Sequence, residues 1–135
     1  SYRELRNFCE IMRALGYPRL ISMENFRKPN FELVADILYW LAKGFQIFRS
    51  IFKQLTHRYD PNTDISDEID EEKNRVEFIK SVTLLFATKA RIKLNPKKLY
   101  QADGHAVQEI LKVAVMLYKA YNTTGNEDEH SIPEQ

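Results

Sequence analysis

Helix-stop and helix-start residues alternate closely between Gly16 and Asn30, and they restrict this part of the chain to short helices joined by tight turns. Gly16 supplies a stop because glycine readily adopts the left-handed backbone that ends many helices. Ser22 supplies the next start, since its hydroxyl can accept a hydrogen bond from the amides that follow. Pro29 ends this short helix, because the residue before a proline is disfavoured in the helical region. The pattern predicts a helix over residues 2–15, a short one after Ser22, and a third that begins near Asn30.

Apolar residues recur at three- and four-residue steps along these segments, which is the period of an amphipathic helix. In the first helix the apolar stripe includes Cys9, so we expect this cysteine to be buried. In the third helix the stripe continues in phase from Leu41 to Leu55. Side chains expected to anchor the core or the short helix are Leu20, Ile21, Phe26, Leu38, Leu41, Val76, Phe86 and Leu111.

The second half of the chain carries its own start and stop signals. A helix is expected from about Asp70, because acidic residues cluster there and anions favour helix N-termini. Asn95 followed by Pro96 is typical of an N-cap and a first helical position. Asp103 caps a last helix that should stop before Gly125. With long helical stretches and no alternating strand pattern, the sequence predicts an all-α domain of about five to six helices.

Length and charge distribution bound the class of protein. With 135 residues the chain fits one domain. The charge, counted along the sequence, is +5 over 1–58, −5 over 59–75, +5 over 76–121 and −4 over 122–135. This alternation favours basic helices, an acidic loop and an acidic flexible tail at 122–135 over a uniformly basic nucleic-acid binder. No secretory signal or membrane span is recognisable, so we expect a cytoplasmic domain that binds neither nucleic acid nor membrane.

Residue types that usually carry catalysis or bind metals are sparse. His57, His105 and His130 lie far apart, and no His or Cys pair has ligand spacing, so no metal site is predicted. Cys9 would need a neighbouring base to act as a nucleophile, and its place on an apolar stripe favours a core thiol. No phosphate-binding glycine loop or nucleophile elbow occurs. We therefore expect neither an enzyme nor a bound cofactor.

A cluster of cations is the best candidate for a functional surface. Five fall within ten residues across the junction of two expected helices: Lys89, Arg91, Lys93, Lys97 and Lys98. We expect Arg91, Lys97 and Lys98 to be exposed, and an acidic partner could dock there. The alternative is that solvated cations merely offset the dipole at a helix C-terminus. Four aromatic residues fit the core first and a contact surface second: Tyr17, Trp40, Tyr59 and Tyr100. Of these, Trp40 is expected in the core, whereas Tyr17, which lies in a turn, fits both equally well.

Two segments are similar to signatures of a known family. Residues 12–31 read Met-Arg-Ala-Leu-Gly-Tyr-Pro-Arg-Leu-Ile-Ser-Met-Glu-Asn-Phe-Arg-Lys-Pro-Asn-Phe, and residues 97–104 read Lys-Lys-Leu-Tyr-Gln-Ala-Asp-Gly. Both resemble the clusterin-associated protein 1 (qilin) family of intraflagellar transport subunits. Residues 74–94 add Arg-Val, Phe-Ile-Lys and Ala-Thr-Lys-Ala, so the resemblance spans nearly all of residues 2–121 except one insertion.

The resemblance implies a fold and a role. It implies a divergent calponin-homology domain over residues 1–121, followed in the family by a coiled coil that lies outside this chain. The implied role is a non-catalytic adaptor of intraflagellar transport complex B that docks the WD-repeat propeller of another subunit for cilium assembly. The implied locations are the cytoplasm, the cilium, the ciliary base and the axoneme. Some relatives of the fold bind tubulin, which is the runner-up partner, and actin binding rests on fold analogy alone.

Residues 44–57 form the insertion relative to the family pattern. This segment is fourteen residues long, equal to two heptads, so the apolar stripe of the third helix passes through it in phase. We therefore expect it to be mostly helical and to lengthen that helix. Its large apolar side chains should either pack against the domain or pair with another chain. Self-association through Phe48, Ile51, Phe52 and Leu55 is one expected interaction.

Overall fold

The computed structural model describes residues 2–56 and 69–125. Within these residues the chain forms helices and no strand, which confirms the all-α class. The elements in chain order are α1 (Tyr2–Leu15), a short 3-10 helix η1 (Met23–Phe26), α2 (Phe31–Thr56), α3 (Arg75–Lys89), α4 (Pro96–Gln101) and α5 (Gly104–Gly125). Most of the expected acidic tail, residues 126–135, lies outside the described residues, and so does His57.

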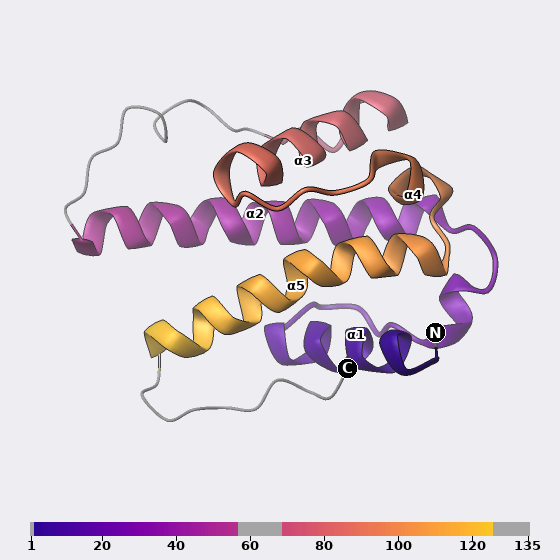
Figure 1. Ribbon diagram of the computed structural model, residues 1–135, viewed down its shortest axis with the longest axis horizontal. Coiled ribbons are helices and arrows are strands. Elements are labelled where there is room, and N and C mark those ends of the chain that lie inside the picture. Colours follow the sequence, from indigo (N-terminus) through magenta and orange to yellow (C-terminus); the bar gives the residue numbers. More distant parts are fainter. Residues whose placement is uncertain (1, 57–68, 126–135) are drawn as a thin grey trace.

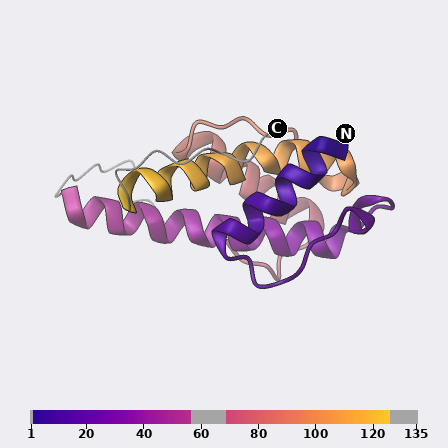
Figure 2. The same cartoon turned by 90° about the horizontal axis from the view of Figure 1, so that it is seen from below.

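The long helix α2 runs through the middle of the molecule (Figure 1). It packs against α3, α4 and α5, while α5 also contacts α1 and α4. In the view of Figure 1, α5 therefore lies between α2 and α1, and α3 lies on the opposite side of α2. Turned by 90°, Figure 2 shows α1 crossing α2 and α5 obliquely. The first and last helices are thus neighbours although they stand at opposite ends of the sequence.

The core lies where α2 meets the other helices. Leu38, Leu41 and Phe86 are completely buried and Leu111 is nearly so, as predicted. The rings of Phe45 and Phe86 lie 5.4 Å apart between centroids and join α2 to α3. Burial of a large apolar side chain contributes about 1.5–3 kcal/mol relative to leaving it in water, so this contact surface is the main source of stability.

Helix ends follow local hydrogen-bonding chemistry. Gly16 ends α1 with a φ of 92°, in the left-handed region that the sequence assigned to it. The start of α3 is later than predicted, because Asn74 is its cap and accepts a hydrogen bond from the Glu77 N–H at 2.9 Å. Asp70 instead accepts from the Glu72 N–H at 2.8 Å, which makes a turn ahead of the helix. The helix α5 includes Gly125, one residue beyond the expected stop.

The prediction that Cys9 is buried is wrong, because it is only partly covered. The buried face of α1 centres on Phe8, Ile11 and Met12. Successive residues of a helix are rotated by about 100°, so Cys9 falls on the flank of that face.

Two other expected anchors are also exposed. Leu20 is almost fully exposed, since it lies in the non-helical segment before η1 and no helix presents it to the core, whereas Phe26 is buried as expected. Val76 is exposed because the larger side chains of Phe78 and Leu85 turn α3 so that they face inward.

The segment 44–57 is helical up to Thr56, the last residue described before the gap. It lengthens α2 without a break, as predicted from its two-heptad length. Among residues 44–55 of this segment, whose burial the structure describes, only Phe45 is buried, and most of the apolar residues that follow are exposed to solvent. Among the described residues, no helix combines the length and apolar character that a membrane crossing requires.

Candidate partner-binding surface

The connection between α3 and α4 carries part of the cation cluster. It runs without helix or strand structure from Arg91 to Asn95, and more exposed and more buried side chains alternate along it. Leu94 is buried and Ile92 is half-buried, whereas Arg91 and Lys93 are exposed. The apolar residues of this segment thus fix it to the core and direct the cations outward.

Arg91 has an unusual backbone conformation for its residue type. Its φ is 57°, in the left-handed region that non-glycine residues rarely adopt. The next residue, Ile92, donates its N–H to the Phe86 carbonyl oxygen at 2.9 Å, which holds the chain in the turn that ends α3. The tight turn therefore places the Arg91 side chain. The attraction of a cation to the C-terminal dipole of α3, which the sequence offered as an alternative, is not needed to explain its position.

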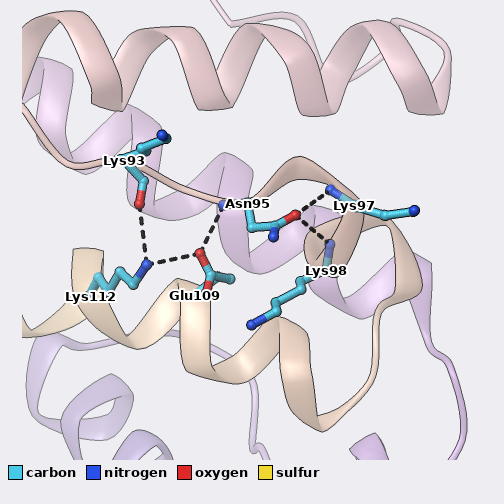
Figure 3. A network of polar contacts seen from close by, with 6 residues as sticks. All are labelled: Lys93, Asn95, Lys97, Lys98, Glu109 and Lys112. Atoms are coloured by element: carbon cyan, nitrogen blue, oxygen red, sulfur yellow. Dashed lines mark hydrogen bonds and ion pairs between the residues drawn. The ribbon is translucent and has the colours of Figure 1, made fainter.

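Asn95 organises the start of α4. Its side-chain oxygen accepts hydrogen bonds from the backbone N–H groups of Lys97 and Lys98 at 3.0 and 3.2 Å, as the sequence predicted for an N-cap (Figure 3). Pro96 fills the first helical position. The backbone N–H of Asn95 itself donates to the Oε1 atom of Glu109 on α5 at 2.8 Å. Asn95 therefore both caps α4 and links it to α5 by a hydrogen bond.

Glu109 is a buried carboxylate at the centre of this network. Its Oε1 atom also receives the ammonium group of Lys112 at 3.0 Å, and the same ammonium donates to the Lys93 carbonyl oxygen at 3.2 Å (Figure 3). Burial alone would raise the pKa of Glu109, but the Asn95 N–H, Lys112 and the nearby charge of Lys98 outweigh it and lower that pKa. The carboxylate is therefore ionised at neutral pH and neutralises part of the surrounding charge.

The five predicted site residues do not have equal exposure. Arg91, Lys93 and Lys97 are exposed, while Lys89 and Lys98 are partly buried. The expectation that Lys98 is exposed is wrong, because its side chain runs back towards α5, whereas Lys97 points away from the network (Figure 3). We call Arg91, Lys93 and Lys97 the connection cations, since they are the members of the cluster most accessible to a partner.

Tyr100, on the same short helix as Lys97, forms an aromatic patch with Phe31 and Arg75. Tyr100 is exposed and its ring is 5.6 Å from that of Phe31 at the start of α2. The guanidinium of Arg75, at the start of α3, stands 4.7 Å from the centre of the Phe31 ring. Arginine and tyrosine are common at the centres of protein interfaces. The sequence did not predict this patch, since no local pattern brings Phe31, Arg75 and Tyr100 together.

Of the four aromatic residues considered in the sequence, Tyr17 and Trp40 lie inside the domain, Tyr100 is exposed against the core expectation, and Tyr59 lies outside the described residues. Tyr17 is buried, donates its hydroxyl hydrogen to the Asp36 carboxylate and packs edge-to-face on Trp40, with ring centroids 5.3 Å apart. Burial and the hydrogen bond to Asp36 raise the pKa of Tyr17. Trp40 is partly buried and packs against the core. Tyr17 therefore belongs to the core, which resolves the choice that the sequence left open.

The described residues contain few groups suited to catalysis. Burial raises the pKa of the Cys9 thiol, which keeps it protonated at neutral pH and therefore weakly nucleophilic. Across residues 2–56 and 69–125, no three or more His, Cys, Asp or Glu side chains are placed to hold a metal ion. Of the three histidines, only His105 is described, and it is exposed.

The fold and this surface define an all-helical domain with a basic edge built around a buried carboxylate. The chain belongs to the Clusterin-associated protein-1 family, whose family model matches residues 13–135. It is 54% identical over 134 residues to clusterin-associated protein 1 of Homo sapiens, which covers 99% of this chain and 29% of the relative. It is 56% identical over 127 residues to the Mus musculus protein, a match that covers 94% of this chain and 27% of that protein. It is also 56% identical over 126 residues to the Danio rerio homolog, a match that covers 93% of this chain and 26% of that protein. The chain thus spans less than a third of these relatives.

Proposed function

We propose that this domain is a non-catalytic adaptor of intraflagellar transport complex B, with a calponin-homology fold, that docks the WD-repeat propeller of another subunit during cilium assembly. Membership of the Clusterin-associated protein-1 family is the observation that carries this proposal. The all-helical architecture supports the calponin-homology assignment. The domain would then act in the cytoplasm, at the ciliary base and along the axoneme.

The connection cations provide a surface suited to such docking. Arg91, Lys93 and Lys97 project from a rigid base, because the Asn95–Glu109 hydrogen bond fixes α4 on α5. A pre-organised surface loses little conformational entropy on binding. The exposed ring of Tyr100, one turn after Lys97 on α4, adds an apolar contact beside the charges. An acidic, partly apolar propeller surface would match this combination.

The direct test is a titration of the domain with separately purified propeller, followed by calorimetry. The variant R91E/K93E/K97E should bind at least tenfold more weakly, while its melting temperature stays close to that of the unmodified domain. The matched control is R13E/K80E/K119E, which reverses three exposed cations elsewhere on the surface. If the unmodified domain does not bind, the propeller is not its partner. If both variants bind equally well, the connection cations are not the contact surface.

A second candidate partner is tubulin, and the connection cations favour it because the tubulin surface is acidic. The two partners differ in their expected salt dependence. A contact that rests on exposed lysine and arginine side chains weakens strongly as ionic strength rises, whereas a packed propeller interface weakens less. Co-sedimentation with microtubules at low and at physiological salt separates them. Actin binding, which has only fold analogy behind it, is tested in the same assay with filamentous actin.

A further inference from the structure

The second half of α2 exposes an apolar stripe. Ile47 is 60% exposed, Ile51 50%, Phe52 43% and Leu55 74%. Residues four apart lie on one side of a helix, so Ile47, Ile51 and Leu55 form a continuous row with Phe52 beside it. We call these four residues the α2 stripe. Figures 1 and 2 both show this end of α2 reaching beyond α3.

Phe45 and Phe48 hold this part of α2 against α3 and α5. Phe45 packs on Phe86, and the ring of Phe48 lies 5.6 Å from that of Tyr121 on α5. The approach of α5 is close at this point, since a side chain added at Gly44 would meet the Tyr121 hydroxyl at 3.2 Å. Phe48, which the sequence grouped with the residues expected to self-associate, is instead a partly buried member of the α5 contact. The stripe begins on the outer side of this contact.

Between Ile47 and Leu55, the charges of α2 lie away from the stripe. Lys43, one turn before Ile47, instead places its ammonium 5.6 Å from the centre of the Tyr39 ring. Arg49 and Lys53 are each two positions from Ile51, which corresponds to a rotation of about 200° around the helix axis. The guanidinium of Arg49 instead lies 5.6 Å from the centre of the Phe45 ring, over the core face. The exposed neighbours of the stripe are the uncharged Ser50 and Gln54. A charged partner helix would find no complementary charge along the row, whereas a second copy of the same row meets no like-charge repulsion.

We propose that two copies of this chain associate through the α2 stripe as an antiparallel helix pair. A two-fold axis makes such an interface isologous, so each residue faces the position related to it by symmetry. With Ile51 at the centre of the row, it meets Ile51 of the second copy, and Ile47 meets Leu55. This arrangement covers the whole row from both sides.

The exposed apolar area limits how tightly the two copies can associate. The four side chains expose on the order of 400 Å² together, within the range of large apolar patches on monomers. A standard stable interface buries about 800 Å² on each partner. The α2 stripe supplies about half of that, so we expect a weak dimer that dissociates readily.

Sedimentation equilibrium from about 10 μM to about 1 mM tests for a weak dimer of this kind. The unmodified chain should pass from monomer to dimer over this range. Ile51→Glu should weaken association at least tenfold, because two buried carboxylates would face each other on the axis. The matched control is Leu84→Glu on α3, where Leu84 is 63% exposed, and it should leave the dimer unchanged. A monomer throughout the range, or an unchanged dimer with Ile51→Glu, overturns the proposal.

Thiol cross-linking tests the antiparallel register. In a Cys9→Ala background, which removes the native cysteine, Ile51→Cys should be cross-linked to its own copy by a short bismaleimide. Leu55→Cys alone should not be cross-linked, but a mixture of Leu55→Cys and Ile47→Cys chains should be. Efficient cross-linking of Leu55→Cys to itself would indicate a parallel pair and overturn the proposed geometry.

Discussion

Replacing Glu109 tests whether the buried network holds α4 and its basic edge in place. Glu109 is 5% exposed and accepts hydrogen bonds from the Asn95 N–H and the Lys112 ammonium through one oxygen. A hydrogen bond to a charged group contributes about 1.5–3 kcal/mol. The Lys112 side chain is 48% exposed, so solvent screens this ion pair and it adds no more than ~1 kcal/mol. We therefore expect Glu109→Ala to lower the free energy of unfolding by about 2–4 kcal/mol.

Glu109→Gln separates the charge from the hydrogen bond. The amide oxygen of glutamine can still accept from the Asn95 N–H, whereas the ion pair with Lys112 is lost. The expected loss is therefore smaller, about 1–2 kcal/mol at neutral pH. Both values come from urea unfolding followed by circular dichroism. Glu71→Gln, which removes an exposed carboxylate, is the matched control and should change stability by less than ~0.5 kcal/mol.

The pH dependence gives a second readout of the same charge. The folded state lowers the pKa of Glu109 from its ordinary value of 4.5. The stabilisation is therefore present above that value and is lost as the pH falls through the lower, folded-state pKa. The stability difference between the unmodified domain and Glu109→Gln should be constant near neutrality and shrink below about pH 5. A difference that stays the same at acidic pH, or a loss below ~1 kcal/mol for Glu109→Ala, would refute this account of the network.

Three further changes test other parts of the structure. Leu38→Ala should cost about 2–5 kcal/mol in thermal or urea unfolding, because the side chain is fully buried and leaves a cavity; a loss below that range would mean that the core collapses around it. Arg91→Gly should be more stable than Arg91→Ala by about 1 kcal/mol, since only glycine relieves the left-handed backbone, and equal stabilities would contradict a strained turn. Deleting residues 44–57 should leave a cooperatively unfolding helical domain, because the fourteen-residue step brings Tyr59 to the position of Phe45; loss of helical circular dichroism would show that the segment is essential.

Helix ends were the most predictable features of this chain. The caps at Gly16 and Asn95 depend on hydrogen bonds and backbone angles within a few residues, so the sequence alone indicates them. Where two capping residues compete, local rules do not decide between them. Asp70 and Asn74 both make capping-type contacts, and the helix starts after the second, while Ile69, ahead of both, is buried in the core. The burial of Ile69 is a matter of tertiary packing, which capping residues do not specify.

The candidate site was predictable in composition but not in arrangement. The cations of the cluster are contiguous in sequence, so they were found by counting charges. Glu109, which accepts a hydrogen bond from Asn95 from fourteen residues away on another helix, could not be found in this way. The pairing of Phe31, Arg75 and Tyr100 is more distant still in sequence. Contacts of this kind arise from the crossing of helices, which a period of three or four residues does not specify.

The packing of α1 on α5 determines the order in which the domain can be completed during synthesis. Glu4 accepts a hydrogen bond from Gln108 at 3.1 Å across 104 positions of sequence. A ribosome adds about 5–20 residues each second, so the partner of α1 arrives on the order of 5–20 s after α1 itself. A helix forms within about a microsecond, so α1 exists without α5 for nearly all of that interval. Phe26 of η1 can cover Phe8 soon after α1 is made, but the part of the α1 face that packs on α5 stays in water until α5 emerges.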